Sequence, residues 1–431
     1  MLIELRIKNF RSFRDEQVLS LVASSDKTLE ENCTSVGKLR LLKAIGIYGA
    51  NASGKSNLIK AIDIMQKLVL NSADFKPGAN LRIRPFLLNG KSQREPTLFE
   101  VTFVHNRIRY QYGFTATTKR FEEEWLIAYP KEVAQTWYER SYNQQRAEYE
   151  WKYSTFLKGE KAKLADKTRE NALFLSAGAQ WNNEQLTTVY EWFKDKLHIA
   201  PPRQNFSPVT AKMLLDVEKQ EDAKEELYDF VTEALQNADL GIEGVDVQQL
   251  KFDRDEIKFP EVIPPEIQEK MLKRLEKEPP LKIEMVHRNV DTGEDVRLPL
   301  QEESDGTQRF FQLLGPCMET VVYGFTVFID ELEVSLHPLL TRELIKFIQD
   351  PGNNQSGAQL IFATHDTNLL DPDLLRRDQV WFTEKDECGA TNLYSMSDYK
   401  ERRPRKGEAM QKGYLAGRYG AIPILKAFGV K

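Results

Sequence analysis

Alternating apolar and polar positions near the start of the chain predict antiparallel strands. Residues 2–8 and 17–23 carry this period-two pattern and are separated by the polar turn Arg14-Asp15-Glu16, so they predict an edge hairpin. Residues 97–117 alternate in the same way around a turn at His105-Asn106 and predict a second antiparallel pair. An antiparallel β-subdomain is therefore expected in the first part of the chain.

Continuous apolar runs elsewhere predict buried parallel strands. Residues 44–48 form such a run and lead through a glycine-rich turn to a predicted helix, whose apolar positions are Leu58, Ile62, Met65 and Val69. A strand at 281–286 and a helix ending near Tyr323 are expected next. Apolar strands at 325–329 and 359–363 then flank a helix over 338–349. This order of elements predicts the α/β class, with a mixed sheet around the glycine-rich turn.

The middle of the chain differs in character from both ends. Long charged amphipathic segments predict a mainly helical insertion over 121–280, with candidate segments at 120–128, 134–156, 184–197, 208–237 and 265–277. Proline pairs at 201–202, 264–265 and 279–280 separate its elements. The predicted organisation is a first lobe over 1–120, the insertion, and a second lobe with a tail over 281–431.

Composition limits the class of protein without selecting a partner. The 431 residues include 60 basic and 65 acidic side chains, and the resulting charge of −5 leaves room for a local basic patch. Cys33, Cys317 and Cys388 lie far apart and form neither a disulfide pattern nor a zinc pattern. No window approaches the ~18 uncharged apolar residues of a membrane span, and the charged start does not resemble a secretory leader. We therefore expect a cytoplasmic chain with no membrane partner.

The segment Gly49–Ser56, GANASGKS, matches the pattern GxxxxGK[ST] in full and lies between the predicted strand and helix. Glycines let successive backbone N–H groups curl around phosphate oxygens, and the helix N-terminus adds its positive end. Lys55 is expected to reach the β- and γ-phosphates, and Ser56 to ligate Mg²⁺. The candidate phosphate-binding residues are Gly49, Asn51, Ser53, Gly54, Lys55, Ser56 and Asn57.

Two later apolar strands end in residues that suit the same chemistry. The strand at 325–329 is followed by Asp330 and Glu331. Because neighbouring side chains of a strand project apart, Asp330 is expected to serve the Mg²⁺ shell and Glu331 to polarise an attacking water. The strand at 359–363 brings His365 to the same end of the sheet, where a neutral imidazole can donate to a γ-phosphate.

A second anion site is expected at residues 303–308, ESDGTQ, which precede an apolar helix. Ser304 or Asp305 can cap that helix, and its free N–H groups, a hydroxyl and Gly306 suit an anion. Two such sites on one chain indicate that each nucleotide lies between one subunit's phosphate loop and the other subunit's serine-glycine helix.

These elements, in this order, resemble the ATP-binding-cassette (ABC) ATPase head of the SMC, RecF and OLD superfamily. The resemblance assigns a Walker A loop at 49–56, a signature motif at 303–308, a Walker B strand at 325–331 and a switch histidine at 365. The opening IKNFRSF at 7–13 is similar to the first strand of those heads, where an arginine and a serine approach the nucleotide, here Arg11 and Ser12. The signature departs from the usual LSGGQ.

The phrase DELEVSLHP at 330–338 is similar to the OLD-type form of Walker B and D-loop, which implies D-loop roles for Ser335 and His337. The resemblance implies Mg²⁺-dependent hydrolysis of ATP in a head-to-tail homodimer. Its implied catalytic residues are Lys55, Glu331 and His365, and its implied residues acting in trans are Ser304, Asp305, Gly306 and Gln308.

Two further phrases, RENALFLS at 169–176 and KGYLAGRYGAIP at 412–423, resemble the stand-alone ATPase subunits of two-gene bacterial anti-phage systems, the PARIS and Rlo types. This resemblance implies an oligomeric ATPase that senses a phage trigger protein and holds or activates a separate TOPRIM-type nuclease. Two alternatives stay open: a RecF-like DNA-binding repair ATPase, and a nucleotide-gated binding module with negligible turnover. DNA binding and assembly beyond the dimer also stay open.

Overall fold

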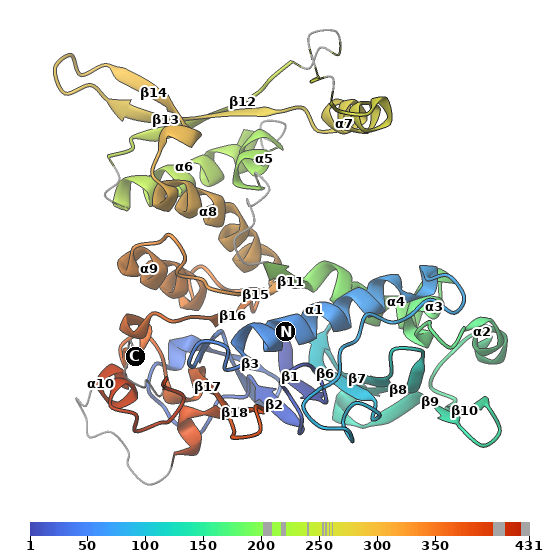
Figure 1. Cartoon of the computed structure of the whole chain (residues 1–431). Coiled ribbons are helices and arrows are strands. Elements are labelled where there is room, and N and C mark those ends of the chain that lie inside the picture. Colours follow the sequence, from blue (N-terminus) through green and yellow to red (C-terminus); the bar gives the residue numbers. More distant parts are fainter. Residues whose placement is uncertain are drawn as a thin grey trace, which may run out of the picture. The chain divides into compact units, whose positions relative to one another are not determined.

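Figure 1 shows the computed structural model, which describes residues 1–200, 209–216, 221–238, 241–251, 254, 257, 259–260, 262–399 and 410–423. The chain forms two compact units. Unit 1 comprises Met1–Arg203, Thr320–Val334 and Thr341–Lys431, and unit 2 comprises Gln204–Glu319 and Ser335–Leu340. The boundary therefore falls well inside the predicted insertion, and the signature segment belongs to unit 2.

The first sheet of unit 1 has seven strands in the order β10-β9-β8-β7-β6-β1-β2, and every neighbouring pair is antiparallel. The two predicted hairpins are confirmed, although only β2 of the first one lies at the sheet edge. The strands are β1 (Leu2–Lys8), β2 (Gln17–Ser20), β6 (Thr97–His105), β7 (Ile108–Ala116), β8 (Phe121–Tyr129), β9 (Gln135–Asn143) and β10 (Glu148–Tyr153).

The second sheet of unit 1 has the order β11-β15-β16-β5-β17-β18; its first five strands are parallel and β18 is antiparallel. Its strands are β5 (Ala44–Tyr48), β11 (Leu197–Ala200), β15 (Thr326–Ile329), β16 (Gln359–Ala363), β17 (Val380–Lys385) and β18 (Thr391–Ser395). Every residue of β5 and β16 is buried, as their continuous apolar runs predict. The carboxyl ends of the parallel strands share one edge, which is where open α/β sheets bind ligands.

One core joins the two sheets of unit 1 and includes the apolar stripe of helix α1 at Leu58, Ile62, Met65 and Val69. Phe103 stacks on Trp192 in this core with 3.9 Å between ring centroids. A separate hairpin is formed by β3 (Cys33–Val36) and β4 (Leu39–Leu42). The helices are α1 (Lys55–Asn71), α2 (Lys161–Lys167), α3 (Phe174–Gln180), α4 (Glu184–Glu191), α9 (Pro338–Gln349), which begins in unit 2, and α10 (Met410–Leu415).

The predicted helical insertion is wrong over its first part, because residues 121–153 form strands β8, β9 and β10. Two charged side chains in this segment, Glu124 and Arg140, are buried as an ion pair with 3.0 Å between Arg140 Nε and Glu124 Oε2. The hydroxyls of Tyr112 and Tyr138 also donate to Glu124. Inward charges of this kind hide the period-two pattern of a strand, so the segment looks like a charged helix in sequence.

Unit 2 contains a three-stranded antiparallel sheet and helices. The sheet order is β12-β13-β14, and β13 fulfils the strand predicted at 281–286. The elements are β12 (Gly244–Gln249), β13 (Leu281–Arg288), β14 (Asp295–Pro299), α5 (Val209–Asp216), α6 (Glu221–Asn237), α7 (Pro265–Lys277) and α8 (Asp305–Tyr323), which ends in unit 1.

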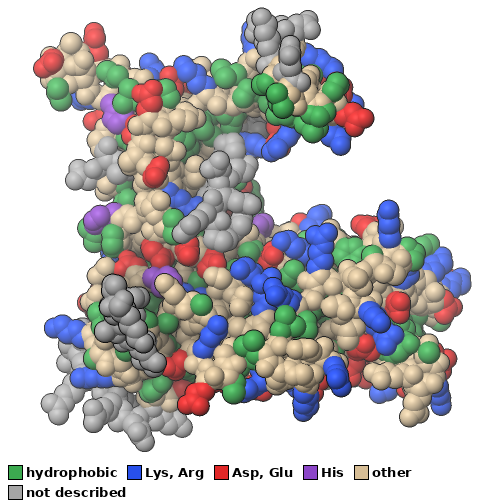
Figure 2. All heavy atoms as spheres, viewed as in Figure 1, with side chains coloured by type: hydrophobic (Ala, Val, Ile, Leu, Met, Phe, Trp, Pro, Cys, Tyr) green, Lys and Arg blue, Asp and Glu red, His purple; other side chains and the backbone are tan. Residues whose placement is uncertain are grey.

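Charged side chains of both signs are interspersed over the face seen in Figure 2, in agreement with a net charge that selects no partner. None of the helices in the described part of the chain is long and apolar enough to cross a membrane. The predicted fold class is confirmed, although residues 121–153 form strands and not helices. Unit 1 has a mixed sheet around the phosphate-loop motif and an antiparallel sheet, and helical segments lie in the chain between this motif and Asp330.

Candidate functional site

The Walker A loop (Gly49–Ser56) connects the buried strand β5 to helix α1. Two of its glycines have backbone φ angles of +148° (Gly49) and +128° (Gly54), which L side chains rarely adopt. A Cβ on Gly49 would lie 2.4 Å from Thr383 O, and one on Gly54 would lie 2.5 Å from Thr391 Oγ1. The loop is therefore pressed against β17 and β18 so closely that only glycine fits at these two positions.

A cavity of about 480 Å³ lies on this loop. It brings together most of the predicted residues of unit 1, and its lining consists of Asn51, Ala52, Ser53, Gly54, Lys55, Ser56, Asn57, Asp330, Glu331, His365 and Lys385. Three predicted residues of unit 1 lie outside this lining: Gly49, Arg11 and Ser12. Of these, Ser12 is adjacent, because its Oγ accepts a hydrogen bond from Asn57 Nδ2 (2.9 Å) and lies 2.8 Å from Thr391 Oγ1. Arg11 is directed toward the Phe10 ring, with its Cζ 5.7 Å from the ring centroid.

Lys55 is the buried cation of the cavity. Its Nζ donates to Gly49 O (2.8 Å) and Ala50 O (3.3 Å), so the ammonium group is held within the loop. Burial lowers the pKa of Lys55 to about 8, and the negative charges of Asp330, Glu333 and Glu331 oppose this shift. At neutral pH most of the population therefore still carries the ammonium, which can exchange its carbonyl partners for phosphate oxygens.

Asp330 and Glu331 follow β15 at the edge where the parallel strands end. Asp330 is buried, and its Oδ1 has no hydrogen-bond partner among the described residues. An orphaned buried carboxylate oxygen is costly unless a cation or donor joins it. Because Ser56 supplies a hydroxyl to the same cavity, the two residues offer the hard oxygen donors that Mg²⁺ prefers. The donor set therefore fits the predicted cation.

His365 follows β16, and its backbone N–H donates to Glu333 Oε1 over 2.7 Å. Burial and the positive charge of Lys55 lower the pKa of His365 below its usual value. The nearby carboxylates of Glu333, Glu331 and Asp330 act in the opposite direction but do not cancel this shift. The imidazole is consequently neutral at pH 7 and has one N–H to donate. Glu333 is a residue that the sequence prediction missed, and its Oε2 is buried without a hydrogen-bond partner among the described residues. Its position as the third acid of the DELE phrase is the signal that could have found it.

The signature segment is built at the start of α8 in unit 2. Ser304 Oγ accepts a hydrogen bond from the backbone N–H of Thr307 (3.1 Å), so Ser304 is the N-cap and Asp305 is the first helical residue. Gly306 is closely approached, because a Cβ there would lie 2.9 Å from Ser335 O. Gln308 Nε2 donates to Glu303 O over 2.8 Å. The predicted signature and D-loop residues therefore lie together.

The two D-loop residues differ in their surroundings. Ser335 has a left-handed backbone with φ of +63°. His337 Nδ1 accepts from the backbone N–H of Leu339 over 3.3 Å, at the beginning of α9.

Both phrases that resemble the anti-phage ATPases pack on the Walker A element. Asn171 Nδ2 donates to Lys76 O (2.8 Å), and Arg169 Nη2 donates to Ala73 O (2.6 Å), just beyond the carboxyl end of α1. In the second phrase, the Tyr414 ring lies 6.1 Å from Tyr48 and 5.4 Å from Phe382, centroid to centroid. The first phrase thus packs just beyond the end of α1, and the second packs on the last residue of β5, where the loop begins.

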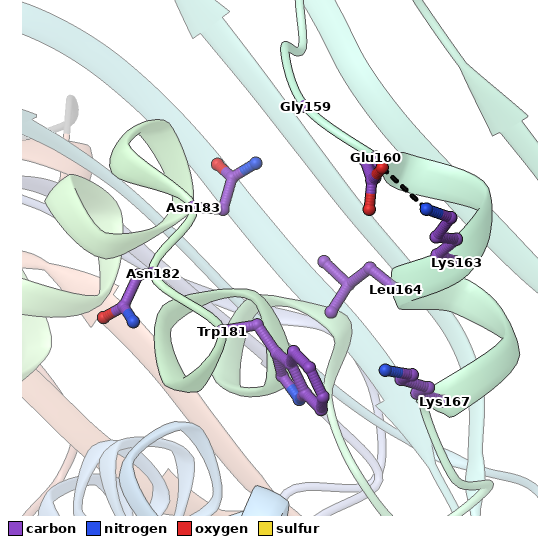
Figure 3. Close-up of a pocket in the computed structure, with 8 residues that line it drawn as sticks. All are labelled: Gly159, Glu160, Lys163, Leu164, Lys167, Trp181, Asn182 and Asn183. Carbon is purple, nitrogen blue, oxygen red and sulfur yellow. Dashed lines mark hydrogen bonds and ion pairs between the residues drawn. The ribbon is translucent and has the colours of Figure 1, made fainter.

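A second hollow in unit 1 has a different character (Figure 3). It measures about 250 Å³ and is lined by Gly159, Glu160, Lys163, Leu164, Lys167, Trp181, Asn182 and Asn183. Lys167 Nζ lies 3.7 Å from the centroid of the Trp181 ring, and Lys163 pairs with Glu160 over 2.7 Å. Glu160 and Lys163 are paired with each other, Lys167 lies against the Trp181 ring, and the lining has no glycine-rich loop, so the Walker A cavity is the stronger candidate site.

The fold and the cavity define a P-loop ATPase head of the ABC type. The sequence matches a protein family over residues 45–371, about three quarters of the chain, and the description of that family is "AAA domain, putative AbiEii toxin, Type IV TA system". The protein belongs to this family.

Comparison with curated protein sequences gives no match. Among solved structures, "Crystal structure of the SmcHead bound to the C-winged helix domain of ScpA" is similar at 10% identity over 91% of this chain and 97% of that chain. The TM-score of this match is 0.42.

Proposed function

We propose that the protein is a Mg²⁺-dependent ATPase that acts as the sensor and scaffold subunit of an anti-phage defence system. The observation that carries the ATPase part is the single cavity lined by the Walker A loop, Asp330, Glu331 and His365. Phosphoryl transfer depends on positioning and charge neutralisation more than on covalent chemistry. This cavity offers groups for both tasks.

In this proposal each residue has a defined task. The loop N–H groups and Lys55 bind the phosphates, while Ser56 and Asp330 hold Mg²⁺, which neutralises charge that develops on the phosphate oxygens. Glu331 orients an attacking water and accepts its proton. His365, neutral at pH 7, donates to the γ-phosphate. Glu333 accepts from the backbone of His365 and so fixes the position of that residue.

The proposed site is completed by a second copy of the chain. Helix α8 begins with a serine N-cap and a closely approached glycine, and the positive N-terminal end of a helix is suited to an anion. We infer that Ser304, Asp305, Gly306 and Gln308 of one subunit face the nucleotide held by the other. Closure of this homodimer around ATP is the proposed signal.

The proposed defence role is supported by the protein family and by two sequence phrases. The description of the family names a toxin of a type IV toxin–antitoxin system, and the phrases at 169–176 and 412–423 resemble anti-phage ATPase subunits. The proposed partners are a separate TOPRIM-type nuclease, held or activated by this protein, and a phage trigger protein.

The test of the ATPase part is phosphate release by the purified chain with ATP and Mg²⁺. We expect turnover in the wild type and none in Lys55→Ala, whereas equal phosphate release from both would contradict the assignment. For the defence part, the gene is tested in its native locus against a phage panel. Protection that is lost in Lys55→Ala supports the role, and protection that persists argues against it.

A further inference from the structure

We propose that Lys385 is a second phosphate-binding cation of the Walker A cavity, supplied by the hairpin of β17 and β18. The inference rests on the proposed function, because it concerns how the same cavity holds a nucleotide. Lys385 lies 330 residues from Lys55 in the chain, yet both line one cavity.

Strand pairing explains why Lys385 reaches the loop. β17 runs parallel to β5, and Phe382 pairs with Tyr48 in their register. One residue further, Thr383 faces the loop, with 2.6 Å between its Oγ1 and Ser53 Oγ. Side chains two apart on a strand share a face and lie about 6.6 Å apart along it. Lys385 is therefore on the same face as Thr383, one step nearer the mouth of the cavity.

The backbone that carries Lys385 is fastened to the loop on its other side as well. In β18, Thr391 Oγ1 donates to Ser53 O (2.6 Å), and the Thr391 backbone N–H donates to Ser12 O (2.7 Å). The turn between the strands is tied by Asp386, whose carboxylate pairs with Arg14 over 3.2 Å. Only the flexible side chain of Lys385 has to move for its ammonium to meet a phosphate.

Lys385 has no evident structural task that would explain its position. It is exposed, and among the described residues it forms no ion pair, although acidic residues flank it. Those neighbours are engaged elsewhere: Glu384 accepts from the Tyr394 hydroxyl, and Asp386 binds Arg14. Its ammonium is therefore available to a ligand.

The charge of the cavity gives the physical reason for a second cation. Asp330 and Glu331 bring two carboxylates to the lining, and among the described lining residues Lys55 is the one other lysine beside Lys385. A nucleoside triphosphate adds several negative charges, so a second ammonium directed into the cavity lowers the electrostatic cost of binding. A charge-assisted hydrogen bond to phosphate is among the stronger ones available to a side chain.

The experiment is a titration of the full-length chain with a fluorescent ATP analogue and Mg²⁺. It compares the wild type with Lys385→Ala, Lys385→Arg and Lys55→Ala. Lys167→Ala is the matched control, because Lys167 is an exposed lysine that lines the other hollow (Figure 3). Thermal unfolding of each variant without nucleotide separates loss of a ligand contact from loss of the fold.

We expect Lys385→Ala to bind about tenfold more weakly at an unchanged midpoint of unfolding. Lys385→Arg should recover most of the affinity, because it restores the charge, and Lys167→Ala should bind like the wild type. If Lys385→Ala binds as the wild type does while Lys55→Ala loses binding, Lys385 is a solvated surface lysine and the inference is wrong, although the proposed function stands. A wild type that binds no nucleotide overturns both.

Discussion

The buried ammonium of Lys55 makes nucleotide binding dependent on pH. Burial lowers the pKa of this residue to about 8. The charged form therefore predominates below pH 8 and is lost above it, whereas a lysine with the usual pKa stays charged up to about pH 10. About 90% of the free protein then carries the ammonium at pH 7 and about 10% at pH 9. If phosphate binding requires the charge, the apparent Kd for ATP rises about tenfold between these two pH values.

The assay is a titration with a fluorescent ATP analogue and Mg²⁺ at constant ionic strength, in half-unit steps from pH 6.5 to about 9.5. Lys55→Arg is the control, because a guanidinium does not titrate in this range. It should bind more weakly than lysine at pH 7, yet with an affinity that does not change with pH. Thermal unfolding at each pH shows that the chain is folded throughout.

A wild-type affinity that stays constant from pH 7 to 9 would refute this reasoning, because it would mean that Lys55 is not desolvated or does not bind phosphate. His365 does not contribute to the expected slope. Its pKa is lowered below the usual value by burial and by Lys55, so it takes up its proton below the interval from pH 7 to 9 in which the slope is expected.

Three further substitutions separate binding, hydrolysis and folding. Gly54→Ala places a Cβ 2.5 Å from Thr391 Oγ1 at a φ of +128°, so we expect a loss of about 2 kcal/mol in urea unfolding and loss of ATP binding; wild-type values for both would contradict the loop geometry. His365→Ala should lower kcat for phosphate release about 100-fold while Kd for ATP stays within about twofold, and unchanged release would exclude the proposed role. Glu124→Gln leaves Arg140 buried without its charge partner and should cost about 3 kcal/mol of stability, with ATP affinity unchanged. Stability within about 0.5 kcal/mol of the wild type would show that this pair does not hold the antiparallel sheet.

The central strands were predictable because a strand that is buried on both faces has a continuous run of apolar residues in its sequence. β5 and β16 are mainly apolar runs in which every residue is buried. Asp330 and Glu331 come directly after β15, and His365 comes shortly after β16. Parallel pairing then brings these residues to one edge, so most of the cavity follows from local patterns. The strands after residue 120 were not predictable in the same way, because the buried charges of Glu124 and Arg140 occupy inward positions.

The contacts of the β17–β18 hairpin with the Walker A loop could not be predicted from the sequence, for a different reason. Thr383, Lys385 and Thr391 belong to no motif, and only the pairing of β17 with β5 brings them to the loop. Glu333 was also missed, although its neighbours Asp330 and Glu331 were identified. The DELE phrase marks Glu333 as an acid beside the site, but the hydrogen bond that it accepts from the backbone of His365, 32 residues later, follows no spacing rule.

The central claim, that two copies of the chain enclose ATP between them, is tested most directly by the mass of Glu331→Gln in solution. With ATP and Mg²⁺ this variant should bind nucleotide without hydrolysing it, and light scattering should show the 49.8 kDa subunit mass doubling. Adding Ser304→Ala should prevent the doubling while ATP binding persists. A Glu331→Gln protein that stays monomeric when saturated with ATP, or that pairs equally well without Ser304, would contradict the account.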